Sequence, residues 1–225
     1  MRLSVNEEPD ESESYIVEAP YEEAVKAADI ELVIFDLDEV ILLSTKILDK
    51  SNEPQKDDLE IKAFWMSAVV TYIKCFNEGT RLKISSKIFE PLPGAVDAHE
   101  YFKDIRNKYI AHSVGALENS KTLLVLSPKN EENRKFLRVN SFNYRQLYPN
   151  LENIETLINL ASEAKKVMRE FREKMLIEVA LKAAKEPIEL LFALPYASMI
   201  IPGRDEMKSN RKSLTKTKAR VGRNN

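Results

Sequence analysis

The sequence contains few of the side chains that bind zinc or form disulfides. Its 225 residues include one cysteine and two histidines, whereas a structural zinc site needs about four such ligands. We therefore predict no metal and no cofactor, and a metal ion would have to be held by carboxylates alone. Cys75 lies among apolar residues and is predicted to be a small core residue of a protein from a reducing compartment.

Glycine and long apolar segments are also scarce. Five glycines argue against a sheet-rich enzyme with many tight turns. The apolar run from Ile188 to Ile201 is interrupted by proline and is too short to span a bilayer of roughly 30 Å, so we expect it to pack on the domain or on a partner. The N-terminal stretch NEEPDESES is acidic and fits neither a secretory signal nor a transit peptide. These features predict a soluble, cytoplasmic protein that does not enter a membrane.

The charges are distributed unevenly along the chain. The formal net charge is -2 and the first 23 residues are rich in Asp and Glu, whereas residues 207–225 carry seven Lys or Arg and no acidic residue. Two interpretations of this basic tail remain open. It is either a solvated chain end or a sequence-independent contact with the phosphates of a nucleic acid, from which Lys and Arg displace counterions.

Apolar residues recur with helical spacing in four segments. They predict helices from Ile30 up to the break that begins at Ser51, from about Asp58 to Asn77, from Ala95 to His112 and from Leu151 to about Lys185. Two prolines between the second and third segments exclude a continuous helix there. Residues 121–142 differ, because two apolar segments flank the polar loop PKNEENR, which is typical of a β-hairpin.

Four amphipathic helices and one hairpin predict a mainly α fold. We expect an up-and-down four-helix bundle with one β-hairpin insertion. The helical domain is assigned to residues 21–186. An acidic, flexible N-terminus (residues 1–20) precedes it, and a C-terminal extension with the basic tail (residues 187–225) follows it.

Asp36 and Asp38 raise one catalytic alternative. They lie in ELVIFDLDEV, which resembles the opening motif of haloacid dehalogenase-like phosphatases, where a strand delivers a nucleophilic and an acid aspartate. Glu39 stands where that family usually has a glycine, and the segments that follow have the pattern of helices rather than of strand–helix units. On a helix the two carboxylates point away from each other. We therefore predict that both are charged residues on the solvent face of a helix.

A second motif lies at the end of the third predicted helix. Residues Arg106 to His112 read RNKYIAH, with the polar Asn107 directly after the arginine. This stretch resembles the Arg-x(4–6)-His signature of the HEPN superfamily, four-helix-bundle proteins that include many metal-independent ribonucleases. The helix order, the long final helix and the hairpin are similar to the abortive-infection-like branch of that superfamily, over roughly Tyr21 to Lys185. The resemblance implies a HEPN-like bundle.

Helix geometry places a condition on such a site. Six residues of a regular helix separate Arg106 from His112 by about 9 Å and about 120°, so the two side chains do not converge on a straight helix. Convergence requires either that the helix ends near Ala111, so that His112 turns back, or that a second copy of the motif comes from a dimer partner. The resemblance implies a homodimer with two facing motifs, an arrangement that a two-fold interface provides.

The resemblance also implies an endoribonuclease that uses the 2′-hydroxyl of RNA as its nucleophile. His112 would act as general acid or base. Arg106 would hold the phosphate and oppose the charge of the transition state, and Asn107 would orient the phosphate or the imidazole. The products would carry a 2′,3′-cyclic phosphate and a 5′-hydroxyl. Further contacts with RNA are assigned to Lys103, His99 and Lys108.

The biological role implied by the resemblance is that of a toxin or phage-defence effector, restrained by an antitoxin or another regulatory protein. Non-catalytic interpretations of the same residues remain open. His112 continues the apolar stripe through Tyr109 and suits a helix C-terminus, and Arg106 has nearby acidic partners in Glu100 and Asp104. The alternative to an enzyme is a non-catalytic helical module that binds RNA or protein.

Overall fold

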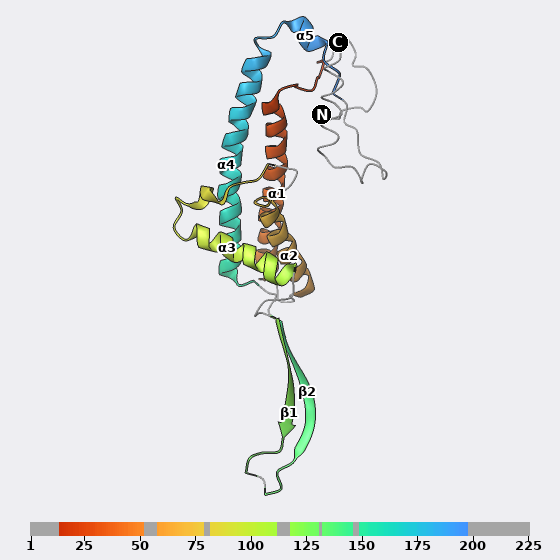
Figure 1. Ribbon diagram of the computed structural model, residues 1–225, viewed down its shortest axis with the longest axis vertical. Helices are drawn as coiled ribbons and strands as arrows, with labels where there is room; N and C mark the ends of the chain where they lie inside the picture. The colour runs from red at the N-terminus through yellow and green to blue at the C-terminus, as the bar shows by residue number, and fades with distance from the viewer. Residues whose placement is uncertain are drawn as a thin grey trace. The chain divides into compact units, whose positions relative to one another are not determined.

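The computed structural model describes residues 14–51, 58–78, 82–111, 118–130, 132–145 and 149–197. Within these ranges the protein is mainly helical and contains one small two-stranded antiparallel sheet (Figure 1). His112 and the basic tail lie outside them, so the sequence-based expectations for both stay predictions. None of the helices in these ranges is long and apolar enough to cross a membrane.

Four longer helices and a hairpin follow the predicted order along the chain. The helices are α1 (Glu22–Ser51), α2 (Asp58–Lys74), α3 (Ala95–Ile105) and α4 (Leu151–Ala183). The strands β1 (Glu118–Leu126) and β2 (Phe136–Arg145) lie between α3 and α4. Shorter elements are the 3-10 helix η1 (Ser86–Phe89), the π-helical turn η2 (Arg106–Ile110) and the helix α5 (Ile188–Phe192).

The start of α1 and the end of α2 differ from the prediction. α1 begins at Glu22 rather than at Ile30. Its first turn contains Glu22 and Glu23, whose charges suit the positive end of the helix dipole, although this turn lacks the apolar spacing on which the prediction depended. α2 ends at Lys74 rather than at Asn77, and the next residues form a turn.

The segment before α3 changes direction, as its prolines require. Ser85 caps η1 by accepting a hydrogen bond from the Lys87 backbone N–H at 3.3 Å. The chain then turns at Gly94, which has a φ of 73°. Glycine adopts this left-handed conformation without the steric cost of a Cβ atom. α3 begins at Ala95, directly after this turn.

The chain divides into two compact units. The first contains the described parts of Met1–Glu31, Glu78–Leu82 and Arg169–Asn225, and the second those of Leu32–Asn77 and Lys83–Met168. The helical domain assigned from the sequence to residues 21–186 therefore includes parts of both units.

In the first unit, residues near the start of the described chain pair with residues that follow α4. Val17 and Tyr196 form an isolated antiparallel bridge. The Tyr15 ring lies beside the rings of Phe192 and Tyr196, with centroids 5.7 and 5.6 Å away. Part of the segment assigned to a flexible N-terminus is thus paired. The apolar run from residue 188 packs within this unit through the same two aromatic side chains.

The core of the second unit takes side chains from α1, α2, α3 and α4. The rings of Trp65 on α2 and Phe102 on α3 meet edge-on, with centroids 5.9 Å apart. Tyr72 on α2 contacts the same Phe102 ring at 6.1 Å, and Leu157 of α4 is fully buried. Cys75 is buried, which confirms the prediction that it is a small core residue.

A pair of phenylalanines tests this description of the core. Phe102 is fully buried, whereas Phe35 on α1 is 69% exposed. We expect Phe102→Ala to lower the free energy of unfolding by about 3–5 kcal/mol, because truncation leaves a cavity. Phe35→Ala is the matched control and should change it by about 0.5 kcal/mol or less. Urea unfolding measures both, and equal losses would contradict the placement of Phe102 in the core.

Candidate functional site

The motif residues Arg106–Ile110 form a single π-helical turn at the end of α3. The Ala111 N–H donates to the Arg106 carbonyl oxygen at 2.9 Å, so this turn spans five residues instead of the four of an α-helix. The regular α-helix therefore ends at Ile105. The end at His112 that the sequence predicted is wrong. The extra residue rotates the end of the motif relative to Arg106. Turns of this kind occur frequently at functional sites.

This backbone meets one part of the condition that helix geometry places on the site. A straight α-helix does not run through the motif, and Ala111 already lies in a bend. The position of the His112 side chain relative to Arg106 stays a prediction, because residue 112 lies outside the described ranges.

Arg106 carries a half-buried positive charge. Its Nη1 donates to Oδ1 of Asn107 at 3.0 Å, and no carboxylate in the described part of the chain forms an ion pair with it. The amide oxygen occupies one of five guanidinium N–H donors and leaves the charge uncompensated. The remaining donors of Arg106 therefore suit an anion. Asn107 is therefore a hydrogen-bond partner of the guanidinium, and its role in orienting the phosphate or the imidazole stays a prediction.

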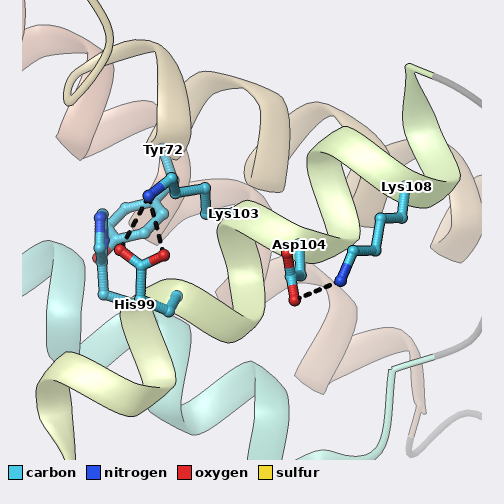
Figure 2. Close-up of polar contacts among 6 residues, drawn as sticks. Tyr72, His99, Lys103, Asp104 and Lys108 are labelled. Atoms are coloured by element: carbon cyan, nitrogen blue, oxygen red, sulfur yellow. Dashed lines mark hydrogen bonds and ion pairs between the residues drawn. The ribbon is translucent and has the colours of Figure 1, made fainter.

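The acidic residues near Arg106 on the same helical segment form ion pairs with lysines (Figure 2). Lys103 Nζ lies 2.9 and 2.8 Å from the two carboxylate oxygens of Glu100, and Lys108 Nζ lies 2.8 Å from Oδ2 of Asp104. The hydrogen bond and the charge of Asp104 raise the pKa of Lys108. Exposed pairs of this kind contribute little to stability. The contacts of both lysines with RNA stay predictions.

His99 does not occupy the surface position that its predicted contact with RNA requires. The residue is 3% exposed, and its Nδ1 lies 3.0 Å from Oη of Tyr72 on α2 (Figure 2). The rings of Phe76 and Phe89 lie beside the imidazole, with centroids 4.5 and 5.6 Å away. Because this environment disfavours the charged ring, burial lowers the pKa of His99. The structure gives His99 a place in the core.

Tyr72 is the polar partner that the sequence did not reveal. Tyr72 is a fully buried residue of α2, and its hydroxyl satisfies the buried imidazole of His99. Burial raises the pKa of Tyr72, so the hydroxyl keeps its proton. Which group donates depends on the tautomer of the imidazole. A general signal was available, because a buried tyrosine usually hydrogen-bonds, but no local pattern identifies a partner 27 residues away.

Asp36 and Asp38 do not form a phosphatase-like pair. Both lie on α1, as predicted. Asp36 accepts a hydrogen bond from Lys74 Nζ of α2 at 2.9 Å, whereas Asp38 pairs with Lys165 of α4. The two carboxylates are thus directed to different helices and do not converge on one phosphate. Asp36 is buried, which corrects the prediction that both face solvent.

Comparison with known proteins does not extend this description. No family model matches the chain, and no curated protein or solved structure matches it significantly.

The lowered pKa of His99 predicts that stability depends on pH. Because this pKa lies below its ordinary value of about 6.5 in the folded state, the unfolded chain binds a proton first as the pH falls. The contribution of His99 to the free energy of unfolding should be constant above that pH. Below it, the contribution should fall by up to about 1.4 kcal/mol per pH unit, until the folded-state pKa is reached.

Urea unfolding on both sides of pH about 6.5 measures this dependence. His99→Gln should flatten it, because the amide does not titrate. His112→Gln removes the only other histidine and is the matched control, which should keep the wild-type dependence. A His99→Gln variant with the wild-type pH dependence would show that the buried imidazole does not govern stability in this range.

Proposed function

We propose that the protein is an endoribonuclease of the HEPN type, with a four-helix bundle that carries one β-hairpin insertion. The observation that supports this most strongly is the π-helical turn Arg106–Ile110. It presents a half-buried arginine that pairs with no carboxylate in the described chain, within the motif that resembles the family signature. The order of α1 to α4, with the hairpin between α3 and α4, also agrees with that resemblance.

In the proposed reaction, the 2′-oxygen of a ribose attacks the adjacent phosphorus and the bond from phosphorus to the 5′-oxygen breaks. His112 removes the proton of the 2′-hydroxyl, and the protonated histidine of a second copy gives a proton to the leaving 5′-oxygen. An imidazole with an ordinary pKa of about 6.5 supplies both forms at neutral pH. The products carry a 2′,3′-cyclic phosphate and a 5′-hydroxyl.

Arg106 binds the non-bridging phosphate oxygens through its planar fork and offsets the charge that develops in the transition state. Its partial burial supports this role, because a charge interaction is stronger where water is partly excluded. The hydrogen bond that Arg106 Nη1 donates to Oδ1 of Asn107 limits rotation of the guanidinium. The exposed Lys103 and Lys108 bind neighbouring phosphates in exchange for their carboxylate partners.

The proposed enzyme acts as a cytoplasmic homodimer, as a toxin or defence effector under the control of an antitoxin or other regulatory protein. One observation favours the alternative, a non-catalytic helical module that binds RNA or protein. The hairpin exposes large apolar side chains, as a binding module does. Cleavage of RNA, or binding without cleavage, separates the two functions.

Substitution of the motif residues tests the proposed chemistry. Arg106→Ala and His112→Ala should each slow the cleavage of total RNA by about 10²–10⁴-fold, since each removes either a proton-transfer group or a charge stabiliser. Arg169→Ala is the matched control, because Arg169 is an exposed arginine of α4. End-labelling of the products should reveal 2′,3′-cyclic phosphates, and a chelator should leave the wild-type rate unchanged. Undiminished cleavage by both variants, or inhibition by the chelator, would refute this mechanism.

The composite site further predicts self-association. Because the proposed reaction takes its general acid from the histidine of a second copy, the wild-type protein should sediment as a dimer at concentrations at which it cleaves RNA. Sedimentation velocity and the cleavage rate are measured on the same samples. A monomer with full activity would rule out a site shared between two copies.

A further inference from the structure

β1 and β2 form a two-stranded hairpin (Figure 1). Most of its apolar side chains are exposed, because two strands do not bury them by themselves. None of its described side chains is buried, and seven of them are large, exposed apolar residues. An isolated two-stranded hairpin is marginally stable in water. Exposed apolar side chains on such an element indicate a binding surface.

One face of this hairpin combines positive charge with an aromatic ring. Residues directly opposite each other in an antiparallel pair share a face, as do alternate residues along each strand. The face contains two cations and no carboxylate, and its phenylalanine is 57% exposed. We call it the basic face, and its members are Lys121 opposite Phe142, Leu123 opposite Asn140, and Val125 opposite Arg138.

The opposite face of the hairpin has a different chemistry. Leu124 lies opposite Val139, and Leu126 lies opposite Phe136. These four side chains are exposed and apolar, and none of them is charged. Among the hairpin side chains that the structure describes, positive charge and aromatic surface therefore coincide on the basic face.

The hairpin as a whole is positively charged in an acidic protein. Residues 118–145 contain six Lys or Arg and three Glu, a net charge of +3, whereas the whole chain has a formal net charge of -2. On the basic face, neither Lys121 nor Arg138 forms an ion pair with a carboxylate of the described residues. A polyanion is therefore the ligand class that complements this surface.

We propose that the basic face of the hairpin binds single-stranded RNA, with Lys121 and Arg138 on phosphates and Phe142 stacked on a base. The choice of RNA rests on the proposed function, because RNA is the substrate of the Arg106 site. Phosphate contacts supply affinity without regard to sequence. Stacking on an aromatic ring requires an unpaired base, which selects a single strand over a duplex.

The register sets the layout of this contact. Lys121 is the cross-strand neighbour of Phe142, and Arg138 lies four residues from Phe142 along β2, about 13 Å away in an extended strand. An RNA strand that runs along the hairpin thus meets a ring and a cation at one end of the face and a second cation at the other.

A second copy of the chain is a poorer ligand for the same face. If two basic faces packed together, Lys121 and Arg138 would approach the same cations of the other copy, and like charges across a sheet interface are destabilising. RNA carries the opposite charge. Charge complementarity therefore favours RNA over self-association at this surface.

The test measures binding of a fluorescent oligouridine to the His112→Ala protein, so that binding is observed without cleavage. Combined Lys121→Ala and Arg138→Ala should weaken binding and reduce the slope of log K against log salt by about 1.4, because each single-strand phosphate contact contributes about 0.7. Phe142→Leu should weaken binding by about tenfold and keep the slope, because it removes stacking and no charge.

Two matched controls accompany these variants. Combined Arg169→Ala and Lys174→Ala removes one arginine and one lysine from exposed positions of α4 and should leave affinity and slope unchanged. Val139→Thr alters the opposite face of the hairpin and should also leave both unchanged. A duplex of the same length should bind more weakly than the single strand and should be insensitive to Phe142→Leu.

An unchanged slope in the hairpin double variant, or an equal loss in the α4 control, would overturn the proposal. If the hairpin double variant lost self-association in sedimentation and kept its RNA binding, the basic face would be assigned to a second copy of the chain. That result would overturn the proposal as well. Hairpin-dependent binding by a wild-type protein that does not cleave RNA would support this inference and contradict the proposed nuclease.

Discussion

The hydrogen bond between the Tyr72 hydroxyl and the His99 imidazole is the contact on which the position of α3 depends. It joins α2 to α3 inside the core of the second unit at 3.0 Å. Either group buried without the other would cost about 1–3 kcal/mol. Phe102, one turn further along α3, packs on the same tyrosine ring. Because a helix is rigid over this length, these contacts also fix the start of the π-helical turn at Arg106, seven residues after His99.

The unpaired charge at that turn follows from the spacing of acidic residues along the helix. Side chains three and four residues apart are neighbours on a helix. Lys103 reaches Glu100 and Lys108 reaches Asp104 at these spacings. The residues three and four positions from Arg106 on either side include no carboxylate. Local pairing therefore gives each lysine a carboxylate partner, whereas the guanidinium forms no ion pair within the described residues.

Regular structure could be predicted from the sequence, because the periodicity of apolar residues shows which side of a segment faces a core. α2 and α4 begin at the predicted Asp58 and Leu151. The π-helical turn could not be predicted, since one extra residue in a turn leaves no trace in composition or spacing. The partners of His99 and Asp36 lie 27 and 38 residues away. Only the folded chain brings such pairs together, so the buried histidine was mistaken for a surface ligand.

Order in the hairpin has a different physical basis from order in the core. Ser120 Oγ donates to Asn143 Oδ1 at 2.6 Å across the strands, and cross-strand pairs contribute roughly 0.2–1 kcal/mol each. Ordering the backbone costs about 1–2 kcal/mol per residue, and burial offsets little of this where side chains are exposed. Part of the binding free energy of a ligand is therefore offset by the cost of ordering the two strands. That cost lowers affinity but leaves the salt dependence intact, because the salt dependence reflects only the number of phosphate contacts.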